Sequence, residues 1–291
     1  MSVKKAIFVV AGFGTRFLPA TKAQPKEMLP IVNKPIIQYL VEEAVEAGIE
    51  EIIFVTGRGK NSIENHFDKS YELEDVLEQK GKNTILKEIA EIADLANFAY
   101  VRQPVQKGDG HALLCARPFV DREEAVLMIF PDYIMPKENQ TIKKMLSLYE
   151  KENKTVIATD YVPASTVSEY GVIAFEPTKD QNAVNIKKFV EKPKIEDAPS
   201  NLISIGYAVL PPKIWDYLES AQSSTTDAEI RVADAYISML DDGGEILAIT
   251  PEKEGYDCGS ILGFLKATVD FGLERDDIGN DFLDFLKKKI G

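Results

Sequence analysis

Cysteine is scarce in this sequence: the 291 residues include two, Cys115 and Cys258. Their spacing fits no zinc motif, and two cysteines in a long chain without a secretory signal indicate reduced thiols. The apolar run Ala6–Ala11 is too short for a signal peptide and leads directly into a glycine-rich turn. No stretch approaches the roughly 18 apolar residues of a membrane-spanning helix. We therefore expect a cytoplasmic protein with no membrane partner.

Positive charge is also in short supply. The chain carries 34 Lys and Arg against 47 Asp and Glu, which gives a net charge of −13. Because the phosphate backbone of a nucleic acid needs a basic face, this balance argues against nucleic acid as a partner. One basic pocket on an acidic surface can still bind a small polyanion, so the few cations close to glycine-rich turns matter most.

Strand-like and helix-like segments alternate through the first half of the chain. The run Ala6–Val10 (AIFVV) is continuously apolar, as in a strand buried on both faces. The segment Pro35–Ala47 has apolar residues at helical spacing and is followed by Gly48. Further strands are expected at Glu51–Val55, Phe98–Arg102, Ala125–Phe130 and Thr155–Thr159, and further helices at Lys60–Phe67, within Glu72–Leu95, from Gly110 and at Thr141–Lys151. This order predicts an α/β, Rossmann-like fold: a mixed, mostly parallel central sheet flanked by helices, with ligands beyond the carboxyl ends of the strands.

The second half has a different pattern. Its strand-like segments, separated by turn-rich stretches, are Tyr170–Phe175, Val184–Glu191 and Asn201–Val209. Helical spacing then recurs at Ile214–Ala221, Asp227–Leu240, Ile261–Leu273 and Asp281–Ile290. Because neither a repeat nor a linker is evident, we expect one domain over residues 1–291, with halves at 1–160 and 161–259 and a helical C-terminal arm at 260–291.

A glycine-rich turn, Gly12-Phe13-Gly14-Thr15-Arg16, follows the first predicted strand. Such a turn points backbone N–H groups at an anion. It is not a Rossmann fingerprint, because Phe17 stands where the third glycine is required, and no Walker A sequence is present. A tight strand-to-helix turn would give the same local pattern.

The turn continues into a proline-rich, cationic loop that reads LPATKAQPKEMLP from Leu18 to Pro30. Prolines stiffen such a loop, so Arg16 and Lys26 could hold both ends of a polyphosphate. The whole pattern, G-x-G-T-R-x-x-P-x-T…P-K, resembles that of the sugar nucleotidyltransferases. The particular residues of the loop resemble their bacterial UDP-glucose pyrophosphorylase branch. Further segments resembling this branch are KNSIENHFD from Lys60, the stretch from Gln103 to Ala112, Tyr170-Gly171-Val172 and Val190-Glu191-Lys192-Pro193.

The resemblance implies a fold of the nucleotide-diphospho-sugar transferase type, with the nucleotide in the first half and the sugar in the second. The nucleotide-binding residues that it implies are Ala11, Gly12, Gly14, Thr15, Gln103 and Gly108. Gln103 has the donor and acceptor needed to read a pyrimidine edge. For the sugar it implies Gly171, where backbone can approach closely, and Glu191, which would accept hydrogen bonds from hydroxyls. Arg16, Lys26 and Lys192 would be the catalytic cations, while His111 is equally compatible with a structural role.

Two acidic residues are candidate ligands for Mg²⁺. Asp132 follows an apolar strand through Pro131, and a carboxylate at a strand's carboxyl end is well placed to hold Mg²⁺ against phosphates. Asp257 is the second ligand that the resemblance implies. Each has an ordinary alternative, because Asp132 could simply form a turn after proline and Asp257 could cap the following helix.

The implied reaction joins UTP and glucose 1-phosphate, with Mg²⁺ as cofactor, to give UDP-glucose and pyrophosphate, and the resemblance suggests a homodimer or homotetramer. Asp109, Tyr207 and Arg231 depart from the usual residues of the branch, near the base side and the acceptor side. They keep open a relative that uses dTTP or another sugar 1-phosphate. A non-catalytic nucleotide-sugar binding protein is a weaker alternative, because Arg16 and Lys26 are both retained, and a dehydrogenase is disfavoured by the missing third glycine.

Overall fold

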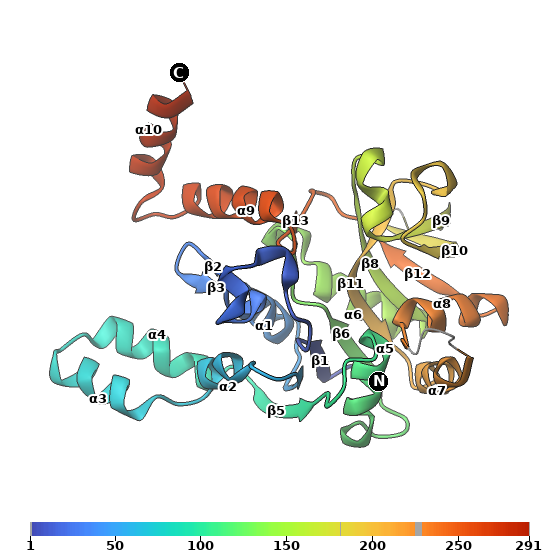
Figure 1. Ribbon diagram of the computed structural model, residues 1–291, viewed down its shortest axis with the longest axis horizontal. Coiled ribbons are helices and arrows are strands. Elements are labelled where there is room, and N and C mark those ends of the chain that lie inside the picture. The colour runs from blue at the N-terminus through green and yellow to red at the C-terminus, as the bar shows by residue number, and fades with distance from the viewer. Residues whose placement is uncertain (1, 181, 225–228, 291) are drawn as a thin grey trace.

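The computed structural model describes residues 2–180, 182–224 and 229–290, and one large sheet forms its centre (Figure 1). The strands of this sheet are β1 (Lys5–Val9), β4 (Glu51–Thr56), β5 (Asn97–Arg102), β6 (Val126–Ile129), β8 (Thr155–Tyr161), β9 (Gly171–Pro177), β10 (Ala183–Glu191), β11 (Leu202–Leu210) and β12 (Ile246–Ile249). They lie in the order β5-β4-β1-β6-β11-β8-β12-β10-β9. All but β10 and β11 point the same way, which confirms the mixed, mostly parallel sheet.

Helices cover both faces of the sheet, and each face has its own apolar core. One face packs against α1 (Ile36–Glu46), α2 (Asn61–Phe67) and α6 (Thr141–Glu152). The other packs against α5 (Asp109–Ala116), α7 (Ile214–Ser224) and α8 (Val232–Asp241). Successive residues of β1 alternate between the two cores, with Phe8 in the first and Ile7 in the second. Two-sided burial is the reason for the continuous apolar run of this strand.

The strands of the second half curl into a nearly closed ring. β9 pairs with β10 along its length and also with β11, through Val172 and Ile203. A bulge in β11 between Ser204 and Ala208 accompanies this curvature, and Gly206 within it has a φ of +83°. A side chain there would collide with Phe130, because a Cβ atom would lie 2.7 Å from its ring.

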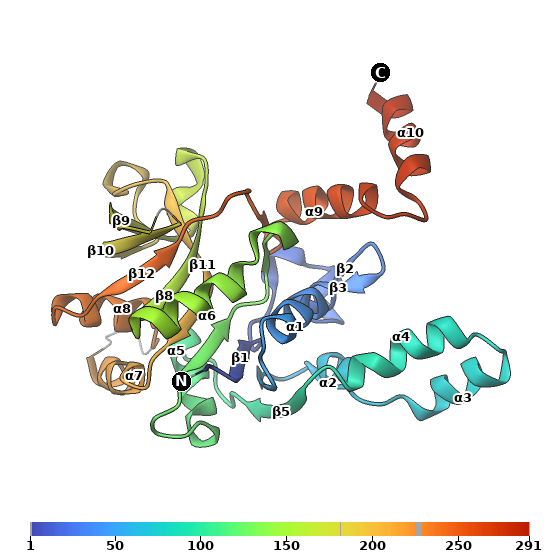
Figure 2. The ribbon, with the colours of Figure 1, turned by 180° about the vertical axis from the view of Figure 1, so that it is seen from behind.

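Two helical extensions project from the body on the side of the short hairpin formed by β2 (Pro30–Ile31) and β3 (Lys34–Pro35) (Figures 1 and 2). The first pairs α3 (Tyr71–Gln79) with α4 (Asn83–Ala93). The predicted break near Gly81 lies between them. The second is the C-terminal arm, α9 (Ile261–Leu273) and α10 (Gly279–Ile290), in which Phe282 packs against Gly272.

Some elements were not expected from the sequence. They are β12, the β2–β3 hairpin and the short pair of β7 (Tyr133–Ile134) with β13 (Tyr256–Asp257). The predicted start of one helix at Asp227 lies outside the described residues, and α8 itself begins at Val232. Within the part of the chain that the structure describes, no helix is long and apolar enough to cross a membrane.

Candidate active site

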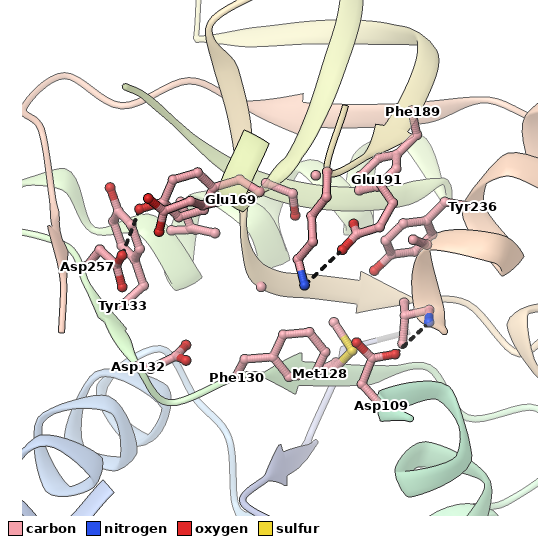
Figure 3. A pocket seen from close by; sticks show the side chains of 18 of the residues that line it. Asp109, Met128, Phe130, Asp132, Tyr133, Glu169, Phe189, Glu191, Tyr236 and Asp257 are labelled. Carbon is pink, nitrogen blue, oxygen red and sulfur yellow. Dashed lines mark hydrogen bonds and ion pairs between the residues drawn. The ribbon is translucent and has the colours of Figure 1, made fainter. Parts of the chain in front are cut away.

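Two pockets meet beyond the carboxyl ends of β1 and β6, and both are lined by Asp109, Phe130 and Asp132. The glycine-loop pocket also contains Ala11, Gly12, Lys26, Gln103 and Gly108. The β10 pocket also contains Arg16, Gly171, Glu191, Lys192 and Asp257 (Figure 3). The fold therefore brings together every predicted site residue except Gly14 and Thr15, which line neither pocket.

The glycine-rich turn is held in place by hydrogen bonds to its carbonyl groups. Gly14 has a φ of +65°, a left-handed conformation that side chains disfavour. The Thr21 hydroxyl donates to its carbonyl over 2.7 Å, and the Gln106 amide donates to the carbonyl of Ala11 over 2.6 Å. The turn thus has a defined shape at the mouth of the glycine-loop pocket.

A buried ion pair anchors the cationic loop. The Lys60 Nζ atom lies 2.8 Å from Glu27 Oε2, and the two side chains are only 6% and 1% exposed. Burial lowers the pKa of Lys60, and the Glu27 carboxylate opposes this. Lys60 comes directly before α2, whereas Glu27 follows Lys26 in the loop, so the pair ties the loop to the body beside the pocket.

Gln103 lies at the far wall of the glycine-loop pocket. Its amide Nε2 donates to the carbonyl of Gly108 over 2.9 Å and lies 3.0 Å from Nδ1 of His111. Gly108 has a φ of +93°, and a Cβ atom there would lie 2.3 Å from the carbonyl oxygen of Ile230. Only glycine fits this position. The missing side chain allows residues 107–110 to lie directly against Ile230, just before α8.

Asp132 and Lys26 form a charged pair where the pockets meet. Their Oδ2 and Nζ atoms are 2.5 Å apart. Burial alone would raise the pKa of Asp132, but the Lys26 ammonium outweighs it and holds that pKa below its usual value. Burial likewise opposes the charge of Lys26, yet Asp132 raises the pKa of the amine overall. Both groups are therefore ionised near neutral pH.

Asp257 faces Asp132 from the neighbouring strand. The strands β7 and β13 pair so that Asp257 lies opposite Tyr133, the residue after Asp132. A Cβ atom placed on Gly259 would lie 2.9 Å from Oδ1 of Asp257 and 3.2 Å from Oδ2 of Asp132, so the two carboxylates border one space. Burial raises the pKa of Asp257, a hydrogen bond of 2.7 Å from the Tyr170 hydroxyl opposes the rise, and the charge of Asp132 adds to it.

This pair fits a hard divalent cation. Two carboxylates with oxygen atoms around one space, each raising the energy of the other's charge, are relieved by a cation between them. Among the described residues, no group of three or more His, Cys, Asp or Glu side chains could hold a metal. Phosphate oxygens and water would therefore have to complete the coordination.

The wall of the β10 pocket depends on a glycine. Gly171 pairs with Glu191 across β9 and β10, and a Cβ atom on it would lie 2.4 Å from the Phe189 ring and 3.0 Å from Oε2 of Glu191. Burial raises the pKa of Glu191, whereas Lys192, 3.8 Å away, opposes the rise. Lys192 itself has a φ of +45°, an uncommon backbone conformation for a residue with a side chain.

Comparison with known proteins places this geometry in a family. Residues 5–272 match the nucleotidyl transferase family. The chain belongs to that family. A curated relative, the UTP–glucose-1-phosphate uridylyltransferase of Staphylococcus epidermidis, is 46% identical over 287 residues, which is 98% of each chain. A UTP-bound UGPase from Acinetobacter baumannii is 41% identical over 98% of each chain, with a TM-score of 0.88. A UDP-glucose pyrophosphorylase complexed with UDP-glucose is 41% identical over 94% of this chain and 100% of its own, with a TM-score of 0.83.

The three residues that depart from the usual motifs of these nucleotidyl transferases have different surroundings. Tyr207 is fully buried, lines neither pocket and donates its hydroxyl to the carbonyl of Tyr133, which itself lines the β10 pocket. Arg231 also lines neither pocket and pairs with Glu229 over 2.7 Å. Asp109 lines both pockets and accepts a hydrogen bond of 2.8 Å from the backbone N–H of Val232. Among the three departures, Asp109 is thus the one that lines the pockets.

The structure also bears on the structural roles considered above for Asp257, Asp132 and His111. The helix cap before α9 is Ser260, whose hydroxyl accepts from Gly263 N, so Asp257 is not the cap. Asp132 does lie in a turn with Pro131, but its side chain points to Lys26 and the cleft. His111 contacts Gln103, which gives it a supporting place beside the glycine-loop pocket.

The sequence analysis did not identify the buried groups that support the site residues. Asp160, fully buried at the end of β8, accepts a hydrogen bond of 2.7 Å from the Tyr133 hydroxyl. The Lys60–Glu27 pair was missed as well. One signal was present for Asp160, because it is an acidic residue near the carboxyl end of an apolar strand, as Asp132 is.

Proposed function

We propose that this chain transfers the uridylyl group of UTP to glucose 1-phosphate, giving UDP-glucose and pyrophosphate. The names of its relatives support this, as do the bound UTP and UDP-glucose of two similar structures. The observation that carries the proposal is the position of Asp132. It lies where the glycine-loop pocket and the β10 pocket meet, beside Lys26 and facing Asp257, so that charged groups surround the junction of the two pockets.

The reaction needs charge neutralisation rather than a general base. A phosphate oxygen of glucose 1-phosphate attacks the α-phosphorus of UTP, and the bond to pyrophosphate breaks. Because the nucleophile is already an anion, the barrier comes largely from repulsion between two polyanions. One pair of unit charges 4 Å apart repels by about 4 kcal/mol at an effective dielectric near 20. Arg16, Lys26 and Lys192 offset this repulsion and align the phosphates.

We propose Mg²⁺ as the cofactor, held by Asp132 and Asp257. When bound, it would neutralise part of the phosphate charge. Before it binds, Lys26 occupies Asp132 and Tyr170 occupies Asp257. Lys26 is therefore poised to turn from Asp132 to a phosphate, which keeps its positive charge near an anion throughout.

Recognition of the base and the sugar follows from the groups that remain available. Among the described residues, both polar contacts of the Gln103 side chain use its amide nitrogen, so the amide oxygen can accept from the imide N–H of uracil. Cytosine lacks that donor, which makes CTP a poor substrate. On the other side, Glu191 borders the β10 pocket beside Gly171 and would accept from sugar hydroxyls.

The test is to incubate the protein with glucose 1-phosphate, Mg²⁺ and each nucleoside triphosphate separately, and to follow pyrophosphate release. We expect release with UTP that depends on both the sugar phosphate and the metal. Release with dTTP instead would keep the reaction and overturn the nucleotide. Absence of release with every triphosphate and with a panel of sugar 1-phosphates would overturn the proposal in favour of a binding protein.

We further propose that the C-terminal arm joins two copies of the chain into a homo-oligomer. α9 packs on the body through Phe264 and Phe271, whereas α10 stands away from it. The exposed apolar residues of the arm are Ile261, Leu262, Leu265, Ile278, Leu283, Phe285 and Ile290. Such a row of apolar residues in water favours association. Light scattering on the full chain and on a variant with Leu265→Glu and Phe285→Glu should show an oligomer and a monomer, respectively. A monomeric wild type would refute the proposal.

A further inference from the structure

The carboxylate of Asp160 is buried without a cation beside it. Its side chain is fully enclosed, and no Lys or Arg among the described residues forms an ion pair with it. Three donors satisfy it instead. Oδ2 accepts from the Tyr133 hydroxyl at 2.7 Å and from the backbone N–H of Gly255 at 2.6 Å, and Oδ1 accepts from the N–H of Tyr161 at 2.7 Å. A buried charge is kept only where such bonds replace water.

Two of these donors belong to the strands that carry the candidate metal ligands. Tyr133 directly follows Asp132, and Gly255 is two residues before Asp257. One oxygen atom of Asp160 thus bonds both the β7 segment and the β13 segment, which pair with each other over only two residues. Asp160 itself lines neither pocket.

We propose that Asp160 is a positioning residue that sets the separation of Asp132 and Asp257, so that the two carboxylates hold one divalent cation. The proposal rests on the proposed function for its catalytic consequence, but not for its effect on metal binding. It differs from the contacts of Lys26 and Tyr170, because those touch the ligand carboxylates directly, whereas Asp160 fixes the backbone that carries them.

Only a carboxylate fits all three donors. An amide has one accepting oxygen and one donating nitrogen. In Asp160→Asn, the amide nitrogen would face either the N–H of Tyr161 or the two donors on β7 and β13. The variant keeps the size and shape of the side chain. Even with its oxygen in the Oδ2 position, it loses the bond from Tyr161, and the bonds from Tyr133 and Gly255, which form the clamp between the two segments, lose the strength that the carboxylate charge gives them.

A matched control lies next to it. Thr159 is equally buried on the same strand, and its hydroxyl donates to the carbonyl of Ile249 over 2.7 Å. That bond joins β8 to β12 rather than to the β7 and β13 segments, which carry the candidate metal ligands. Thr159→Val therefore removes a buried hydrogen bond of the same length without touching the clamp.

The experiment measures Mn²⁺ binding to the full chain in the presence of UTP. Water proton relaxation reports Mn²⁺ on the protein rather than on free nucleotide. We expect Asp160→Asn to weaken Mn²⁺ binding about tenfold and Thr159→Val to change it less than twofold, with both variants folded by circular dichroism. In turnover, Asp160→Asn should need about tenfold more Mg²⁺ for half-maximal rate, while its KM for glucose 1-phosphate at saturating Mg²⁺ stays within twofold of wild type.

Three results would overturn the inference: wild-type Mn²⁺ affinity in Asp160→Asn, equal weakening by Thr159→Val, or no Mn²⁺ binding by the wild type. If Asp160→Asn does not fold, Tyr133→Phe removes one of the three bonds and decides in its place, again by Mn²⁺ binding. If the wild type binds Mn²⁺ with UTP but releases no pyrophosphate, the proposed function fails while the Mn²⁺ comparison still decides the role of Asp160.

Discussion

The two walls of the cleft are held by different forces. On the nucleotide side, ion pairs dominate: Lys60 with Glu27 behind the loop and Lys26 with Asp132 in front of it. On the sugar side, neutral tyrosine hydroxyls donate to carboxylates, Tyr133 to Asp160 and Tyr170 to Asp257. Under the proposed function, the first wall would bind a polyphosphate, which positive charge close by stabilises. The second would bind a sugar ring, for which hydrogen bonds provide a fixed shape without surplus charge.

The largest effect should come from breaking the buried ion pair on the nucleotide side. Lys60→Met leaves Glu27 charged and without a partner in the interior, so we expect a loss of about 3–5 kcal/mol in the free energy of unfolding. The double variant Lys60→Met, Glu27→Met removes both charges and should recover most of the loss. Urea denaturation of the two variants measures this.

The control for that comparison is an exposed pair with the same geometry. Lys137 and Glu46 are also 2.8 Å apart, but their side chains are 83% and 58% exposed. Lys137→Met should cost at most about 1 kcal/mol, because exposed pairs are screened by water. Equal losses in Lys60→Met and Lys137→Met would show that burial does not distinguish the nucleotide wall.

The second largest effect should be on catalysis at the junction of the walls. Asp132→Ala removes a proposed metal ligand and leaves Lys26 without its partner. We expect kcat/KM for UTP and glucose 1-phosphate to fall at least about 100-fold. Steady-state pyrophosphate release checks this, and a variant within twofold of wild type would remove Asp132 from the catalytic residues.

In the β10 pocket, Lys192 is one of the two cations that we assign to catalysis, the other being Arg16. Lys192→Ala should lower kcat/KM at least about tenfold, the scale of one lost charge-assisted contact in the transition state. Its side chain is 61% exposed, so the free energy of unfolding should change by less than about 0.5 kcal/mol. A rate within twofold of wild type in the same assay would contradict the assignment.

The smallest effect concerns a hydroxyl on the sugar wall. The Tyr236 hydroxyl is buried and has no hydrogen-bond partner among the described residues, while its ring packs on Phe189 with centroids 5.5 Å apart. Tyr236→Phe keeps the ring contact and removes an unsatisfied polar atom. We expect the free energy of unfolding to rise by about 1 kcal/mol in urea denaturation. A loss of stability would show that the hydroxyl forms a stabilising hydrogen bond.

The same contrast explains what the sequence could predict. The nucleotide wall is largely one contiguous stretch, Ala11 to Pro30. Its glycines, prolines and cations lie close together in the sequence, so the stretch alone predicts an anion-binding loop. The parallel strands β1, β4 and β6 were also readable, because burial on both faces makes each of them a largely apolar run. Ile261–Leu273 was predicted with the bounds that α9 has.

The hydrogen bonds of the sugar wall could not be predicted from the sequence, because they join distant parts of the chain. Asp160 meets Gly255 across 95 residues, and Tyr170 meets Asp257 across 87. The two-residue strands β7 and β13 are too short to leave a periodic signal, yet they bring the candidate ligands face to face. The hydrogen bond from Tyr207 to the backbone of Tyr133 spans 74 residues and was likewise not predicted.

The pairing of β9 with β11 affects where the protein can aggregate with other chains. By turning one side of the large sheet back on itself, it leaves β5 as the long open edge, and unpaired edges invite strands of other chains to add on. The outer strand alternates exposed Asn97, Ala99 and Arg102 with half-buried apolar residues. Arg102 is the charge on that edge, so replacing it with an apolar residue would remove a safeguard against aggregation at a position remote from the ring itself.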